Sequence, residues 1–261
     1  MIQTNATLID DDLAKFFKDN DFIVSISLDG NRDSHNKNRY YHGFKGSFDK
    51  TMEGVNILRK NGIFPPVIAT VSKSTYDDGV KNFMFFIENG FTEIKYSPVY
   101  DSSCDNFSID DDKWFLYLKD IFDKWLEIKN PNIKIREIDE ILMWHANKSL
   151  SLCSSRGMCA NWISIDCDGN IYPCEYLRNT NPYGNIESIN LSDVFKLENY
   201  NNFKEKVLSQ PLECQECKLF DLCHNGCPAT RVKDDVLIYD GKYVYCGQRR
   251  KLFEEIQKIL T

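Results

Sequence analysis

The sequence has neither a long apolar run nor an excess of basic residues. Its longest apolar run, Phe83 to Ile87, is far shorter than the roughly 20 residues that cross a bilayer. Its polar and acidic start lacks the basic and apolar segments of a secretory signal. The formal net charge is −7, whereas nucleic acids and anionic membranes bind basic surfaces. We therefore expect a cytoplasmic protein that binds neither a membrane nor a nucleic acid.

Cysteine is almost absent from the first 150 residues, which contain only Cys104. The other nine of the ten cysteines lie between Cys153 and Cys246. Because 42% of the 261 residues are hydrophobic, the chain can form a real core. The uneven cysteine distribution predicts two domains, residues 1–150 and 151–261. In a reducing cytosol, closely spaced cysteines favour metal ligation over disulfides.

The first domain alternates strand and helix patterns. The run Phe22–Leu28 is dense in β-branched and apolar residues, as in a buried strand. Asp10 and Ser47 are expected to cap helix starts, and Gly62 to follow a helix end. The alternation predicts a parallel sheet with right-handed crossovers. Strands are expected at residues 2–4, 22–28, 66–71 and 92–96, and helices near residues 10–17, 47–61, 77–89, 110–129 and 137–150.

The second domain contains two Asp-Gly pairs that predict tight hairpins, because this dipeptide supplies positive φ angles. A hairpin at Asp168-Gly169 brings Cys159 and Cys174 to the same end of a ribbon. A second hairpin is expected at Asp240-Gly241. Cys167 shares a face with apolar residues of the first ribbon, so we expect a buried hydrophobic thiol there rather than a ligand.

Eight cysteines have the spacing of metal ligands. A two-residue interval, as in Cys214-x2-Cys217, lets adjacent thiolates bind one ion or cluster corner without strain. Eight thiolates make two sets of four, and such sets hold either structural zinc or iron–sulfur clusters. Spacing alone leaves both metals open. The eight are Cys153, Cys159, Cys174, Cys214, Cys217, Cys223, Cys227 and Cys246.

The cysteine pattern resembles that of a known family. The run Cys159-x9-Gly169-x4-Cys174 is followed by Cys214-x2-Cys217-x5-Cys223-x3-Cys227 and then by Cys246. This resembles the SPASM domain of radical S-adenosylmethionine (SAM) enzymes, and with Cys153 it is most similar to anaerobic sulfatase-maturating enzymes. The resemblance favours iron–sulfur over zinc. It implies one auxiliary [4Fe-4S] cluster on Cys153, Cys159, Cys174 and Cys227, and another on Cys214, Cys217, Cys223 and Cys246.

The first domain carries the same resemblance. Gln3-Thr4-Asn5, Ser27-Leu28-Asp29-Gly30 and His35-x3-Arg39 are similar to the QTN, SLDG and HDxxR motifs of those enzymes. The implied fold is α/β, an incomplete (β/α)6 partial barrel of the radical SAM type followed by a small cysteine-rich α+β SPASM domain with a C-terminal helix. The CxxxCxxC and GGEP motifs of the family do not occur in the sequence. We therefore expect an exposed strand edge near Ile2 and no radical chemistry by this chain alone.

The resemblance also implies roles for three residues. Ser27 and Arg39 would contact SAM in a complete enzyme. Glu175 stands where sulfatase maturases have an Asp that is thought to take the substrate proton, and it is one methylene longer. Tyr100 stands where those enzymes have a Leu that contacts SAM, which is a departure from the pattern.

The implied reaction is oxidation of a Cys or Ser side chain to formylglycine in a protein or peptide substrate, under anaerobic conditions. An electron carrier such as ferredoxin or flavodoxin would serve as reductant. Ala6, where many maturases have Gly, is also similar to relatives that modify ribosomally made peptides. Two further alternatives stay open, an iron–sulfur module for electron transfer or substrate binding without radical chemistry, and a zinc-stabilised structural domain.

Overall fold

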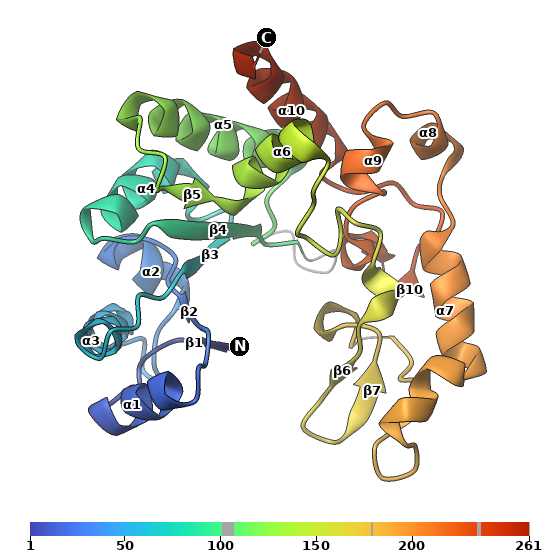
Figure 1. Ribbon diagram of the computed structural model, residues 1–261, viewed down its shortest axis with the longest axis horizontal. Coiled ribbons are helices and arrows are strands. Elements are labelled where there is room, and N and C mark those ends of the chain that lie inside the picture. The colour runs from blue at the N-terminus through green and yellow to red at the C-terminus, as the bar shows by residue number, and fades with distance from the viewer. Residues whose placement is uncertain (101–106, 179, 234–235, 261) are drawn as a thin grey trace. The chain divides into compact units, whose positions relative to one another are not determined.

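The computed structural model describes residues 1–100, 107–178, 180–233 and 236–260 (Figure 1). The chain divides into two compact units. The first comprises Met1–Tyr100 and the described residues up to Asp139, and the second begins at Glu140. Cys104 lies outside the described residues. Among the helices that are described, none is long and apolar enough to cross a membrane.

Five parallel strands form the sheet of the first unit, in the order β1-β2-β3-β4-β5. Within the described residues β1 pairs only with β2, as expected for an edge strand. The strands are β1 (Ile2–Thr4), β2 (Val24–Ser27), β3 (Val67–Val71), β4 (Glu93–Pro98) and β5 (Lys134–Ile135). The helices are α1 (Asp11–Asp19), α2 (Arg32–Asn38), α3 (Phe48–Lys60), α4 (Gly79–Glu88) and α5 (Asp111–Ile128), with a 3-10 turn at Tyr76–Asp78. The helix α6 (Arg136–Asn147) begins in this unit and ends in the second.

The core of the first unit lies between the sheet and its helices (Figure 1). Alternate residues of β3 are buried, because the side chains of a strand point to opposite faces. Ile26 of β2, Phe86 of α4 and Leu118 of α5 have no exposed surface. One face of the sheet is thereby closed by helices, and the carboxyl ends of the strands carry the polar side chains described below.

Local signals account for some of these boundaries. The Asp10 carboxylate accepts the Leu13 N–H at 2.8 Å, which confirms the cap of α1. Gly62 has a φ of 77° just beyond α3, as predicted for a helix end. The prediction for Ser47 is wrong in its mechanism, because its hydroxyl makes no cap hydrogen bond and instead donates to the Arg39 carbonyl at 3.1 Å.

Two elements of the first unit were not predicted. The helix α2 is polar, so it has no apolar period, and it forms because the Asn31 side chain accepts the Asp33 and Ser34 N–H groups. The strand β5 has two residues, which is too short for any pattern. It pairs with β4 through Glu93 and Ile94.

The second unit is built from short elements. Its strands are β6 (Ser164–Ile165), β7 (Asn170–Tyr172), β8 (Gly184–Asn185), β9 (Val232–Lys233) and β10 (Val236–Leu237). Its helices are α7 (Glu198–Leu208), α8 (Leu212–Gln215), α9 (Phe220–Cys223) and α10 (Cys246–Leu260), with 3-10 turns at Cys159–Asn161, Glu175–Leu177, Leu191–Lys196 and Pro228–Arg231. A core around Ile171, Val194 and Phe203 packs against Cys159 and Cys174.

The first predicted hairpin is confirmed and the second is wrong. β6 and β7 pair antiparallel through a turn in which Gly169 has a φ of 81°. Asp168 is not in the left-handed region, so the turn is not of the primed type. Gly241 also lacks a positive φ, and the second hairpin forms between β9 and β10 instead.

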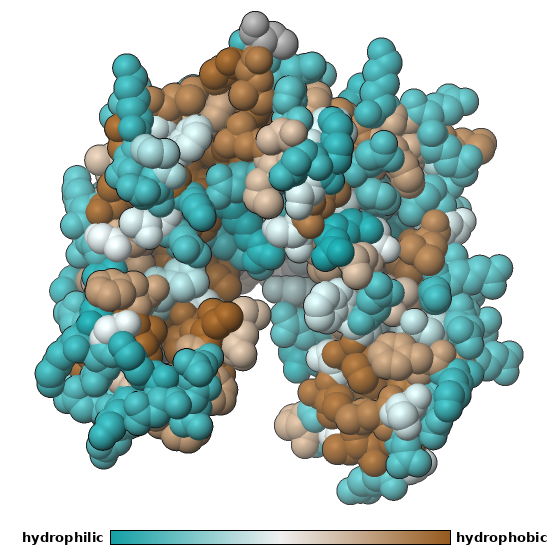
Figure 2. All heavy atoms as spheres, in the orientation of Figure 1, coloured by the Kyte–Doolittle hydropathy of each residue, from teal (hydrophilic) through white to brown (hydrophobic). Residues whose placement is uncertain are grey.

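Cys167 is exposed, which contradicts the expected buried thiol. The strand β6 ends at Ile165, so Cys167 lies in the turn rather than on the ribbon. Ile165 is itself 42% exposed. Figure 2 shows hydrophobic residues gathered over β6 and β7. The face that the sequence assigned to the core is therefore partly a surface.

Candidate functional site

Four cysteines lie close together around the β6–β7 hairpin, and we call them the first thiol group. Cys159 hydrogen-bonds with Cys153, and its other close thiols are Cys174 and Cys227. Cys159 begins a 3-10 turn and Cys174 follows β7, so the hairpin brings them to one end. The Cys153 hydrogen bond and burial raise the pKa of Cys159 well above its usual range, and burial raises the pKa of Cys227 to about 11.

The second thiol group contains Cys214, Cys217, Cys223 and Cys246. The close thiols of Cys214, which lies in α8, are the other three. Cys223 ends α9 and Cys246 begins α10. Burial raises the pKa of the Cys214 and Cys246 thiols. Two short helices, the turn between them, which contains Cys217, and the start of a long helix thus supply the second group.

Both groups have the chemistry of a ligand set for a cationic centre. Burial and neighbouring thiols disfavour thiolates, whereas a bound metal centre stabilises them. A single zinc ion binds four thiolates, whereas in a [4Fe-4S] cluster each thiolate binds a different iron. Within the described residues, no three His, Cys, Asp or Glu side chains converge on a single metal-ion position.

A buried donor lies beside the first thiol group. The Arg231 Nε is buried and has no hydrogen-bond partner among the described residues. The charge of Arg231 acts on Cys159 and Cys227. Sulfide and thiolate sulfur atoms of a bound cluster are acceptors that such a donor needs. The residues present therefore fit an iron–sulfur cluster.

At the carboxyl end of the sheet, Arg39 forms a two-point ion pair with Asp29. The Arg39 Nε lies 2.6 Å from Asp29 Oδ2, and Nη2 lies 3.0 Å from Oδ1. Asp29 Oδ1 also accepts the Thr70 N–H at 2.8 Å. The Asp29 side chain is 2% exposed and that of Arg39 is 28% exposed. Asp29 thus fixes Arg39 while part of the guanidinium reaches solvent.

Ser27 lies on the same end of the sheet, as the last residue of β2. Its Oγ accepts the Gln3 side-chain amide at 3.1 Å from the neighbouring β1. Ligands of open parallel sheets bind outside the carboxyl ends of the strands. Tyr100, which follows β4, is half-buried. The structure therefore places Ser27 and Gln3 side by side where a ligand of such a sheet binds.

His35 connects the ion pair to the start of α3. Its Nδ1 accepts the Asp29 N–H at 3.3 Å, and its Nε2 lies 3.0 Å from Ser47 Oγ. Because the Ser47 hydroxyl donates to the Arg39 carbonyl, the ring proton is assigned to Nε2. Burial lowers the pKa of His35 to about 4. His35 is therefore a neutral, structural residue at neutral pH.

Glu175 is exposed and directly follows Cys174 of the first thiol group. Its carboxylate hydrogen-bonds with the Tyr176 side chain. Burial raises the pKa of Cys174, and the charge of Glu175 raises it further. The structure thus brings this carboxylate next to the first thiol group.

A half-buried carboxyl group with a shifted pKa was not predicted from the sequence. Glu137, in the first turn of α6, accepts the Tyr96 N–H at 3.1 Å. Burial raises the pKa of Glu137 to about 7. A Glu in the first turn of a helix is ordinary, so no sequence signal marked this one. Its burial depends on how α6 follows β5.

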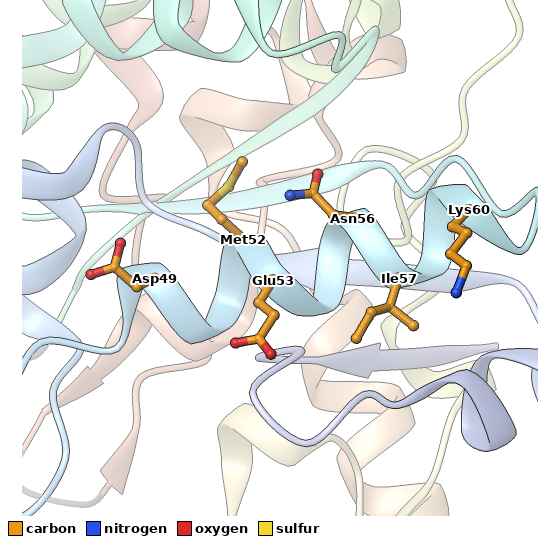
Figure 3. Close-up of a pocket in the computed structure, with 6 residues that line it drawn as sticks. All are labelled: Asp49, Met52, Glu53, Asn56, Ile57 and Lys60. Atoms are coloured by element: carbon orange, nitrogen blue, oxygen red, sulfur yellow. The ribbon is translucent and has the colours of Figure 1, made fainter.

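A surface depression of about 460 Å³ lies along α3, away from the polar residues described above. Figure 3 shows that its lining side chains all come from this one helix. No thiol lines it. The lining residues are Asp49, Met52, Glu53, Asn56, Ile57 and Lys60.

Comparison with known proteins gives a consistent set of relatives. Residues 153–218 match the SPASM family, described as an iron-sulfur cluster-binding domain. A cysteine-type anaerobic sulfatase-maturating enzyme of Clostridium novyi is 32% identical over 234 residues, covering 87% of this chain and 63% of that protein. The solved structure "Native anSMEcpe with bound AdoMet" is 28% identical, with a TM-score of 0.87 over 98% of this chain and 74% of that one. Nearly the whole chain is therefore similar to anaerobic sulfatase-maturating enzymes, and residues 153–218 match the SPASM family.

The chain spans 63% of the length of its Clostridium novyi relative. A second solved structure, "Native anSMEcpe with bound AdoMet and Cp18Cys peptide", has a TM-score of 0.86 at 28% identity and covers 98% of this chain and 74% of that one. The expected fold, a partial barrel followed by a SPASM domain, is confirmed by this likeness.

Proposed function

We propose that this chain is part of a radical SAM/SPASM enzyme that oxidises a Cys or Ser side chain of a protein or peptide to formylglycine. Its sulfatase-maturating relatives support the reaction, and the relative solved with AdoMet and a peptide supports the substrate class. The proposal rests on the observation that eight thiols form two groups of four. Each thiol group would hold one [4Fe-4S] cluster.

The residues of this chain would bind and orient the reactants. Bound SAM and iron–sulfur clusters supply the one-electron chemistry in such enzymes. Ser27 and Arg39 would contact SAM at the carboxyl end of the sheet. Asp29 would hold the Arg39 guanidinium in place through its two-point ion pair.

Glu175 would take the proton from the substrate side chain. The exposed carboxylate is accessible to a peptide, and its hydrogen bond with Tyr176 would orient it. Its position next to Cys174 would place that proton acceptor beside the first cluster. The oxidation releases electrons, which the auxiliary clusters would accept, and ferredoxin or flavodoxin would supply the electron that cleaves SAM.

Metal analysis of anaerobically purified and reconstituted protein tests the proposal. We expect about eight irons and eight sulfides per chain, four of each for every tetrathiolate cluster. About two zinc ions without sulfide would instead support a zinc-stabilised structural domain. A colourless protein without bound metal would overturn both assignments.

Release of 5′-deoxyadenosine from SAM separates an enzyme from an electron-transfer or binding module. With dithionite as reductant, we expect no release by the 261 residues alone, because they contain no CxxxCxxC motif. Addition of a segment that carries this motif is expected to restore release and peptide oxidation. Iron-loaded protein that never cleaves SAM in that mixture would favour the module.

A further inference from the structure

Two arginines of the cysteine-rich unit lie against the thiol groups. Arg231 follows Cys227 by four residues and is 5% exposed. Its Nη1 donates to the carbonyls of Tyr239 at 3.0 Å and Gly241 at 3.2 Å. These two hydrogen bonds fix the plane of the guanidinium.

The rest of the Arg231 guanidinium lies near thiols. Its buried Nε has no hydrogen-bond partner in the part of the chain that the structure describes. The thiols on which its charge acts are Cys159, Cys227 and Cys214. A buried N–H without an acceptor is unfavourable, and sulfur atoms of a cluster on the first thiol group would satisfy it.

Arg249 lies on the second thiol group. It is half-buried in α10, three residues after Cys246, and its guanidinium hydrogen-bonds with Cys223. Its Nη1 also donates to Ser155 Oγ at 3.0 Å. Ser155 has no exposed surface and is held by His224, whose Nδ1 lies 2.6 Å from the Ser155 carbonyl.

We propose that Arg231 and Arg249 are tuning residues, each of which raises the reduction potential of the cluster on the thiol group that it faces. This inference rests on the proposed function, because it requires clusters on both groups. Reduction adds one electron and no proton, so the cluster becomes more negative by one charge. A guanidinium and its N–H···S hydrogen bond stabilise the more negative form, and partial burial strengthens the effect.

Charge-removing variants test the two assignments separately. In Arg249→Gln, the ratio of reduced to oxidised cluster at a fixed potential should fall about tenfold for the cluster on the second thiol group. In Arg231→Gln it should fall about tenfold for the cluster on the first group and by less for the second, because the charge of Arg231 acts on Cys159 and Cys227 before Cys214. A tenfold fall corresponds to about 59 mV for a one-electron couple. Dithionite titration of the full chain, followed by electron paramagnetic resonance, gives both midpoints. Lys258→Gln and Arg156→Gln remove the same charge from exposed positions of the same unit, and should leave both midpoints unchanged.

Iron content distinguishes the ways in which the experiment can fail. Wild-type protein without iron after reconstitution defeats the proposed function itself. Gln variants that keep wild-type iron and wild-type midpoints overturn the tuning inference and leave the proposed function standing. Should a Gln variant lose iron, Arg231→Met or Arg249→Met replaces it, since Met keeps an apolar stem of similar length without charge or donor. A lowered midpoint in the Met variant supports the inference, and an unchanged one overturns it.

Discussion

The Asp29 carboxylate accepts two hydrogen bonds from the Arg39 guanidinium, at 2.6 and 3.0 Å, and a third from the Thr70 N–H at 2.8 Å. The pair joins the end of β2 to the segment after α2 and to β3. Since the carboxylate is almost fully buried, these donors replace the hydrogen bonds that it would make with water. The geometry of the proposed SAM site therefore depends on Asp29.

Asp29→Asn should destabilise the first unit by about 3 kcal/mol, because it leaves a partly buried guanidinium without its counter-charge. The free energy of unfolding from urea titration measures this. Asp49→Asn is the matched control, since Asp49 pairs with Arg32 where both side chains are more than half exposed. The control should change stability little. Equal midpoints for both variants would refute the structural role of Asp29.

Ala6→Gly should stabilise the protein by about 0.5–1 kcal/mol, because Ala6 has a φ of 61° and left-handed backbone disfavours a Cβ. Thermal unfolding measures the change. Ala14→Gly, at an equally buried position inside α1, should act in the opposite direction by about 1 kcal/mol. A loss of stability in Ala6→Gly would contradict the assigned backbone conformation.

Stability should fall as pH decreases from about 6.5 to 4 through His35. The folded pKa of about 4 lies below the ordinary value of 6.5, so only the unfolded chain binds the proton in this range. The loss reaches about 3 kcal/mol at pH 4 and stays constant below it. In His35→Gln this component should disappear from the pH profile of the unfolding free energy. An unchanged profile would show that His35 titrates normally.

Glu137 should act with the opposite sign. Its folded pKa of about 7 lies above the ordinary value of 4.5, so its contribution is complete below pH 4.5 and is lost as pH rises through 7. Glu137→Gln keeps an oxygen for the Tyr96 N–H and removes the charge. It should increase stability by up to about 3 kcal/mol at pH 8 and by little at pH 4. Equal effects at both pH values would indicate a carboxyl group with an ordinary pKa.

Replacement of Cys217 and Cys223 by Ala should unfold much of residues 151–246, because so loop-rich a region depends on bound metal. Iron content should fall at least by half, and the thermal transition of the second unit should be lost. Cys167→Ala removes an exposed thiol outside both groups and should leave iron and stability unchanged. Wild-type thermal stability in the double variant would contradict metal ligation by the second group.

The sequence predicted elements that have a strong local pattern. β2, β3 and β4 lie within the expected runs, apart from the last two residues of β4, because β-branched and apolar residues mark buried strands. Asp10 marked the start of α1 through its side-chain cap. By contrast, β5 has too few residues for a period, and Cys167 is exposed because its strand ends two residues earlier.

The candidate site was predictable where it depends on spacing and not where it depends on packing. Cysteine intervals and the family resemblance identified the ligand candidates, whereas Asp29–Arg39 and Arg249–Ser155 join residues that only tertiary structure brings together. The second hairpin was misplaced because an Asp-Gly pair permits a positive φ without imposing it, and Gly241 does not adopt one.

The two thiol groups interleave along the chain, since Cys227 of the first group lies between Cys223 and Cys246 of the second. Neither group can be excised as a contiguous peptide that is free of ligands of the other. A cluster bound to one group closes a chain loop that contains ligands of the other group. This loop closure lowers the conformational entropy that the remaining ligands lose when they bind the second cluster. Metal insertion should therefore be cooperative, with fully loaded and empty chains dominating over half-loaded ones in native mass spectra of partly reconstituted protein.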